Sequence, residues 1–141
     1  MKRFKFRLER IRNYRITLRK EKERELAIAN AELIDKQSEL ERILQLQNET
    51  PAAPEGQLTM AELVILGDYS AMLQESLENQ RELVEAASEA VEKAREAYIE
   101  KAVEAETLET LKDKKIEEYR QERRKQERKE SDALTVSRFG R

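Results

Sequence analysis

The sequence predicts an all-α protein, a long antiparallel two-helix coiled-coil hairpin whose second helix overhangs the first. Three observations predict this fold. The 141 residues are 41% charged and 38% hydrophobic, a composition typical of coiled coils and too polar for a thick globular core. Apolar residues recur at heptad spacing over most of the chain, and one proline-containing segment interrupts them. Disorder is the alternative interpretation of such a polar composition.

The first helix is expected over about residues 3–47. Two heptad series indicate it, joined by an eleven-residue step from Leu18 to Ala29 that relaxes the supercoil locally. The downstream series is Leu26, Leu33 and Leu40 with Ala29 and Ile43 interleaved, and the upstream series is Phe4, Ile11 and Leu18. An alternating pattern at Phe4, Phe6 and Leu8 would also suit a strand, but the sequence contains no second strand to pair with it.

Residues 48–59 contain both prolines and no apolar periodicity, so they are expected to form a loop. Directly after them, Thr59 and Glu62 have the spacing of a capping box, and Leu58 and Leu63 that of a hydrophobic staple. The second helix is therefore expected over about residues 60–133. Residues 134–141 would then be a flexible tail, and 1–141 a single coiled-coil domain.

Two interleaved heptad series define the expected seam of the second helix. One series is Leu63, Ser70, Leu77, Val84, Val91, Tyr98, Ala105, Lys112 and Tyr119, and the other is Leu66, Leu73, Gln80, Ala87, Ala94, Lys101 and Leu108. The seam runs without a proline from about residue 63 to 111 and more weakly to Tyr119.

Charge is arranged in blocks that suit an antiparallel pairing. Residues 1–24 contain eleven Lys or Arg and three Glu, net +8, whereas residues 85–109 contain eight Glu and three Lys or Arg, net −5. Opposite charges beside a seam help to select partner and orientation in coiled coils. A chain folded about residue 54 would place Leu33 near Leu73, Leu26 near Gln80, Leu18 near Ala87 to Val91, and Phe4 near Glu104. Phe4, Leu8, Ile11 and Leu18 would then be seam residues.

Several classes of function are excluded or unsupported. The chain has no Cys and no His, so disulfides, thiol chemistry, the usual zinc sites and imidazole acid–base catalysis are absent. No apolar run approaches the ~18 residues of a membrane span, so no membrane insertion is expected. Neither a catalytic constellation nor a glycine-rich phosphate loop is present. We expect no enzyme activity, cofactor or metal.

Three features of the sequence are not required for a two-helix hairpin. Residues from about 105 to 133 lack a partner within the chain and form either a solvated overhang or a basic stalk that enters a partner. The start of the second helix carries surplus apolar residues, namely Val64, Ile65, Tyr69 and Met72, which suit an oligomer contact, a docking surface or a site covered by the loop. The last residues, "ESDALTVSRFGR", suit a frayed end or a short binding peptide.

Both ends of the chain resemble the FliJ proteins, components of the bacterial flagellar type III export apparatus. The resemblance rests on Phe4-x-Phe6-x-Leu8 with Ile11 and Arg15, and on "ESDALTVSRF". It implies a hairpin similar to the stalk subunit of rotary ATP synthases, whose termini end inserts into the hexameric ring of the flagellar export ATPase and promotes its assembly and activity. It also implies contacts with export chaperones and with the cytoplasmic domain of the membrane export gate. The expected location is cytoplasmic, at the inner membrane of the flagellar base.

The resemblance also implies two sets of contact residues. Those for the export gate, near the hairpin tip, are Ile43, Leu46, Tyr69, Leu73, Ser76 and Gln80. Those for the export ATPase, at the termini end, are Arg3, Phe4, Lys5, Phe6, Arg7, Arg10 and Arg12.

Competing functions remain open. The equivalent stalk of an injectisome-type secretion system is the nearest alternative. A purely structural coiled-coil protein would self-associate through its tip and stimulate no ATPase. A nucleic-acid or anionic-membrane binder using residues 2–24 is the least favoured, because the surface is balanced in charge and has few aromatics; no nucleic acid is expected.

Overall fold

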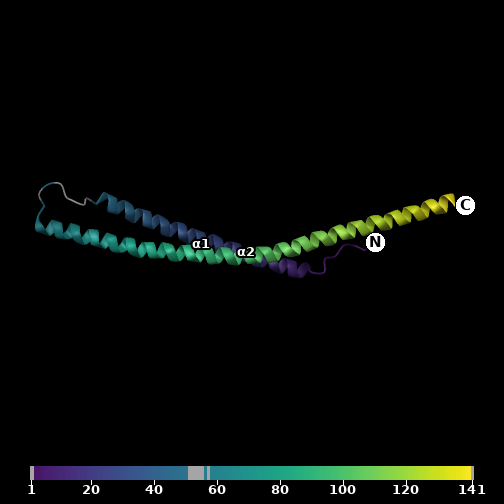
Figure 1. Ribbon diagram of the computed structural model, residues 1–141, viewed down its shortest axis with the longest axis horizontal. Helices are drawn as coiled ribbons and strands as arrows, with labels where there is room; N and C mark the ends of the chain where they lie inside the picture. The colour runs from purple at the N-terminus through teal and green to yellow at the C-terminus, as the bar shows by residue number, and fades with distance from the viewer. Residues whose placement is uncertain (1, 51–55, 57, 141) are drawn as a thin grey trace. The chain divides into compact units, whose positions relative to one another are not determined.

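Two long helices make up the part of the chain that the structure, a computed structural model, describes: residues 2–50, 56 and 58–140. Helix α1 spans Glu9–Glu49 and helix α2 spans Met60–Phe139. They pack against each other as a hairpin in which α2 is the longer helix, so the predicted all-α fold is confirmed. Figure 1 shows both helices, with α1 in purple to blue and α2 in teal to yellow.

The hairpin divides into two compact units. The terminal unit contains Met1–Glu21 with Ile99–Arg141, and the loop unit contains Lys22–Tyr98. In each unit a stretch of α1 lies beside a stretch of α2 that runs in the opposite direction. Each unit thus has its own part of the interhelical seam, and each holds some of the expected contact residues.

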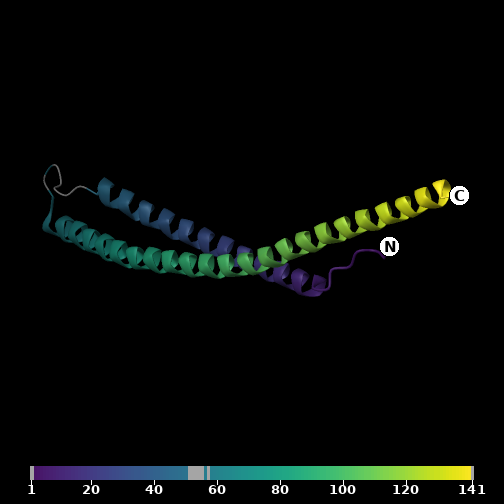
Figure 2. The same ribbon diagram turned by 45° about the vertical axis from the view of Figure 1, so that its right-hand side comes forward.

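Helix α1 begins at Glu9, six residues later than the sequence suggests. Residues 2–6 are not helical and residues 7–8 form a turn, which Figure 2 shows as the purple trace that leads into α1. Phe4, Phe6 and Leu8 are half-buried while Lys5 and Arg7 are exposed. An extended segment points alternate side chains to opposite faces, so the apolar side chains share one face and the basic side chains the other. No β-strand pairs with this segment among the described residues. We call residues 2–8 the N-terminal strap.

The start of α2 is stabilised by the predicted capping box. The Thr59 backbone N–H donates to Glu62 Oε2, and the Glu62 backbone N–H donates to Thr59 Oγ1, both at 3.2 Å. These two hydrogen bonds satisfy amides that the helix itself leaves without acceptors. Most of the expected loop, residues 51–55 and 57, lies outside the described residues.

The seam of the loop unit is apolar at its centre. Ile43 of α1 and Leu73, Leu77 and Val91 of α2 are buried there. The heptad seam predicted for α2 is therefore present from Leu73 onward. Before that point it is incomplete, because Leu66 is half-buried whereas Leu63 is 44% exposed and Ser70 is exposed as well.

The predicted pairing of the helices was wrong by several turns. Gln47 lies against Gln74 (Nε2 to Oε1, 3.0 Å), and Phe4 stacks against Tyr119 where Glu104 was expected. The prediction assumed that the end of α1 and the start of α2 lie side by side. The ten residues between Glu49 and Met60 can span up to about 33 Å, so α2 begins about three turns beyond the end of α1.

The start of the chain uses only part of the expected seam, because Phe4, Leu8 and Leu18 are half-buried and Ile11 is not. Ile11 is 45% exposed and does not belong to the seam. The half-buried positions follow an uninterrupted heptad through Arg12, Arg15, Arg19 and Lys22, so the predicted eleven-residue step is wrong. Long basic side chains can cover a seam with their apolar stems while their charged heads reach acidic groups on the partner helix.

The last turns of α2 remain helical to Phe139, six residues beyond the expected end at about 133. All side chains from Arg120 to Gly140 are exposed. Opposite charges at helical spacing accompany this stretch, for example Arg123 Nε and Glu127 Oε1 at 3.3 Å. Such pairs stabilise a helix that has no neighbour by about 0.2–0.5 kcal/mol each.

Candidate partner-binding sites

The N-terminal strap lies on α2 in the terminal unit. The rings of Phe4 and Tyr119 have centroids 5.5 Å apart with an interplanar angle of 53°, a favourable tilted arrangement. The Tyr119 hydroxyl donates to the backbone carbonyl of Lys2 at 2.8 Å. A groove of about 740 Å³ lies between strap and helix, with Phe4, Phe6, Leu111 and Tyr119 among its lining residues. The strap thus forms one composite surface with α2.

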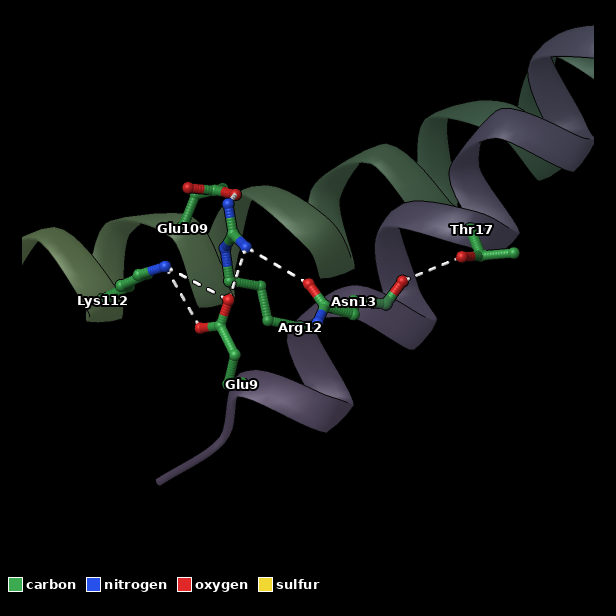
Figure 3. A network of polar contacts seen from close by, with 6 residues as sticks. All are labelled: Glu9, Arg12, Asn13, Thr17, Glu109 and Lys112. Atoms are coloured by element: carbon green, nitrogen blue, oxygen red, sulfur yellow. Dashed lines mark hydrogen bonds and ion pairs between the residues drawn. The ribbon is translucent and has the colours of Figure 1, made fainter. Parts of the chain in front are cut away.

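A network of four charged residues joins α1 to α2 next to the strap (Figure 3). Arg12 forms an ion pair with Glu109 across the helices, and its Nη1 donates to Glu9 Oε1 at 3.0 Å. Lys112 Nζ lies 3.1 Å from Glu9 Oε2 and 3.2 Å from Glu9 Oε1. Two residues from each helix therefore alternate in sign. We call Glu9, Arg12, Glu109 and Lys112 the charge clasp.

The clasp stabilises the charged form of Arg12. Its hydrogen bond with Glu109 raises the pKa of Arg12 further above its usual value, and the charges of Glu109 and Glu9 act in the same direction. Nearby, Arg15 Nη1 donates to the backbone carbonyl of Glu104 at 3.3 Å. The acidic block of the second helix thus does meet the basic start of the first, as expected, but at residues nearer the C-terminus than predicted.

The residues expected to contact the export ATPase fall into three groups. Arg3, Lys5, Arg7 and Arg10 are exposed. The aromatic residues Phe4 and Phe6 are half-buried against α2. Arg12 is engaged in the charge clasp. Four basic side chains are therefore free of the seam and accessible to a partner.

The residues expected to contact the export gate divide between surface and seam. Tyr69 is 37% exposed, and Leu46 and Ser76 are half-buried. Ile43, Leu73 and Gln80 are buried between the helices. The Gln80 side-chain Nε2 donates to the Lys36 carbonyl at 2.9 Å, so its amide is already engaged. The accessible surface at this site therefore comes from Tyr69 and its exposed neighbours.

The exposed neighbours of Tyr69 form an apolar surface at the start of α2. Its members are the exposed residues Met60, Leu63, Val64, Ile65 and Met72, together with Tyr69 itself. We call this set the tip surface. Four of these residues are the apolar surplus that the sequence analysis identified. Met60 and the exposure of Leu63 were missed, because the expected pairing placed Leu63 in the seam.

The charge clasp was also missed. Its only signal in the sequence is the Glu9–Arg12 spacing on one helix and the Glu109–Lys112 spacing on the other, each i, i+3. Such spacings are common on charged helices. Their meeting depends on how the helices are aligned, which the sequence analysis had placed several turns away.

Among the described residues no group of three or more acidic side chains could hold a metal ion. Within the same residues, neither helix has a stretch both long and apolar enough to cross a bilayer. The contact surfaces on offer are the basic N-terminal strap in the terminal unit and the apolar tip surface in the loop unit.

Comparison with known proteins places the chain in a family. A family model described as "FliJ: Flagellar FliJ protein" matches residues 4–141. No curated protein and no solved structure matches the chain. Because the family model covers nearly the whole sequence, the chain belongs to the FliJ family and is a non-enzymatic component of the flagellar export apparatus.

Proposed function

We propose that this FliJ-family chain is the stalk-like partner of the hexameric flagellar export ATPase and promotes the assembly and activity of its ring. Membership of the family over residues 4–141 carries the proposal. The terminal unit supports it, because the N-terminal strap exposes Arg3, Lys5 and Arg7, and the first turn of α1 exposes Arg10, beside a helix that continues to Phe139. Clustered basic side chains speed the encounter with an acidic surface by electrostatic attraction.

A second contact of the same function is made by the loop unit with the cytoplasmic domain of the export gate. The contact uses Tyr69, with Leu46 and Ser76 at its border. Ile43, Leu73 and Gln80 support it from beneath, since they are buried in the seam. The tip surface leaves several large apolar side chains exposed within the first turns of one helix, and exposed apolar surface of this kind is typical of protein–protein docking sites.

The remaining parts of the proposal follow from the family. The chain also meets export chaperones, and it works in the cytoplasm, peripherally at the inner membrane of the flagellar base. A corresponding stalk role in an injectisome-type system is the alternative use of the same hairpin.

The ATPase contact is tested by measuring ATP turnover of the purified export ATPase with and without the chain, at low and moderate salt. We expect stimulation that weakens as salt rises, because exposed charges are screened. Reversing three exposed charges, with Arg3→Glu, Arg7→Glu and Arg10→Glu together, should abolish most of it. The matched control reverses three charges as well, at Arg81, Lys93 and Arg95, which are exposed in the loop unit.

Two outcomes contradict the ATPase contact. Equal loss in the test and control variants would indicate nonspecific charge attraction. No stimulation at any ratio, with the hairpin shown to be folded by circular dichroism, would favour a purely structural coiled coil, which should then self-associate in sedimentation experiments.

The gate contact is tested by titrating the cytoplasmic domain of the export gate with the variant Ile65→Ala/Tyr69→Ala. Both side chains are exposed, so the variant removes apolar contact area without opening the seam. We expect binding to weaken at least about tenfold, as for central interface residues, while ATPase stimulation persists. Leu83→Ala is the control, since Leu83 is exposed on the same helix outside the tip surface. Equal effects of the two variants would contradict the proposed site.

A further inference from the structure

We infer that the charge clasp opens reversibly. Its opening detaches the N-terminal strap and the first turns of α1 from α2, while the two helices of the loop unit stay packed together. The inference concerns regulation of the terminal unit, so its use by the cell rests on the function proposed above. The opening itself is a physical property of the chain and is tested without any ATPase.

The terminal unit has little buried apolar surface to hold it together. Its buried apolar residues are Ala105 and Leu108, both on α2, whereas Ile43, Leu73, Leu77 and Val91 are buried in the loop unit. On the side of α1, Arg12 and Arg15 occupy seam positions and make polar contacts to α2. Half-buried apolar residues such as Leu8, Leu18 and Leu111 contribute as well, but polar and ionic contacts supply a larger share of the attraction between the helices here than in the loop unit.

The ion pairs of the clasp remain open to solvent. The side chains of Arg12 and Glu109 are 20% and 29% exposed, and those of Lys112 and Glu9 are 24% and 40% exposed. Pairs in such positions are screened by salt and contribute little individually. Arg12 Nε is buried and makes none of the hydrogen bonds found among the described residues, which adds a desolvation cost. The clasp is thus specific in geometry but weak enough to open.

Opening the clasp would separate two apolar surfaces. The strap is continuous with α1, and its contacts with α2 are the Phe4–Tyr119 ring pair and the Tyr119 hydroxyl bond to the Lys2 carbonyl. When α1 leaves, the groove loses one wall, and the half-buried side chains of Phe4, Phe6, Leu111 and Tyr119 become more exposed. Helix α2 keeps its own ion pairs, such as Lys115–Glu118 at 3.3 Å, and stays helical. The open state therefore offers a partner two aromatic surfaces that the closed state covers in part.

Amide hydrogen exchange of the full-length chain tests the clasp. We expect that raising NaCl from 0.05 to about 0.5 M, or the variant Arg12→Gln, increases exchange in residues 9–21 about threefold or more, as expected for loss of two modest ion pairs. Exchange in residues 26–47 and 73–94 should not change. The matched control is Arg42→Gln, because Arg42 also pairs with a Glu three residues earlier, at 2.5 Å, but has no ion pair with α2 among the described residues.

Spin-label distances give a second measurement that does not depend on helix fraying. The chain has no cysteine, so Lys5→Cys and Arg120→Cys introduce two unique labelling sites at exposed positions of the terminal unit. We expect one short distance at low salt, and a second, longer population that grows with salt or with Glu109→Gln. The exchanged pair Arg12→Glu/Glu109→Arg should reduce this population relative to Arg12→Glu alone.

Two results would overturn the inference. The first is a terminal unit whose amide exchange and label distance are unchanged by salt, by Arg12→Gln and by Glu109→Gln. The second is salt-dependent opening of both units together. Because neither measurement contains the ATPase, a failure of ATPase stimulation would leave the result on the clasp intact.

Discussion

Individual charged residues of this hairpin have different roles although their local patterns are alike. Arg12 and Arg42 each pair with the Glu three residues earlier on α1. Only Arg12 also reaches a carboxylate of α2, at Glu109. The Arg42–Glu39 pair stays on the surface of one helix, where it can support that helix alone. The partner across the seam, and not the i, i+3 spacing, decides which arginine joins the two helices.

The Arg42–Glu39 surface pair leads to a prediction about pH dependence. The hydrogen bond from Arg42, followed by the charges of Arg42 and Lys36, lowers the pKa of Glu39 below its usual value. Since the folded pKa is lower than the unfolded one, the pair stabilises the fold above the unfolded pKa. That contribution is lost as pH falls through the folded pKa. We expect Arg42→Gln to raise the pKa of Glu39 toward its usual value in a carboxyl NMR titration.

Arg95→Gln is the control for this titration, because Arg95 pairs with Glu92 on the other helix. It should leave the pKa of Glu39 unchanged. An unchanged Glu39 pKa in Arg42→Gln as well would mean that the pair does not form in solution.

At the scale of elements, α2 stabilises its own start. The first turns of α2 have exposed apolar side chains and no buried residue before Leu73, so packing contributes little there. The capping box supplies two hydrogen bonds in its place. Helix ends without tertiary support depend on such local interactions. The exposed tip surface is therefore presented on a helix whose order comes from the cap.

Removing the cap should loosen this start. We expect Thr59→Ala to destabilise the first turns of α2 by about 1 kcal/mol, because the Glu62 amide loses its acceptor. Amide exchange of residues 60–66 measures the effect. Thr110→Ala, at an exposed position within α2, is the control and should cause no loss. Unchanged exchange in Thr59→Ala would show that the cap does not limit fraying.

A substitution at Gly67, in the same stretch of α2, should have the opposite effect on stability. Nothing lies within 4 Å of the position that a Cβ atom would take at Gly67. We expect Gly67→Ala to stabilise α2 by about 0.5–1 kcal/mol, since alanine loses less conformational freedom in a helix. Slower amide exchange around residue 67 would confirm the gain. Faster exchange would indicate that the tip needs glycine at this position for a reason other than space.

At the scale of the whole molecule, the seam changes character along the hairpin. The loop unit buries aliphatic residues, and the terminal unit relies on ion pairs and the N-terminal strap. Gln80 is the polar exception among the buried residues that the structure describes in the loop unit, and it donates to the Lys36 carbonyl. A single polar residue at a seam position selects alignment at some cost in stability. Gln80 therefore contributes to the alignment of the helices.

Replacing Gln80 tests this role. We expect Gln80→Leu to raise the free energy of unfolding by about 1 kcal/mol, because apolar surface is buried and the Lys36 carbonyl keeps its helical hydrogen bond. Denaturation in urea measures the change. Gln37→Leu is the control, since Gln37 is exposed, and should have little effect. A destabilised Gln80→Leu variant would show that the hydrogen bond outweighs the burial.

The sequence by itself determined the kind of elements and their faces. Heptad spacing in Leu26, Leu33, Leu40 and in Leu73 onward indicates helices with one apolar side, and the Thr59–Glu62 spacing marks where α2 starts. These are local properties, because they depend on residues within one or two turns. The excess of apolar residues around Tyr69 could be recognised from the sequence for the same reason.

Only the tertiary structure decided how the helices align and which residues meet. A shift by whole heptads leaves the same apolar positions facing each other, so periodicity cannot distinguish one alignment from another. The Arg12–Glu109 pair, the burial of Gln80 and the exposure of Ile11 all follow from the alignment. The N-terminal strap likewise needed α2 to lie against, because its alternating residues have no preferred structure without a surface that separates their two sides.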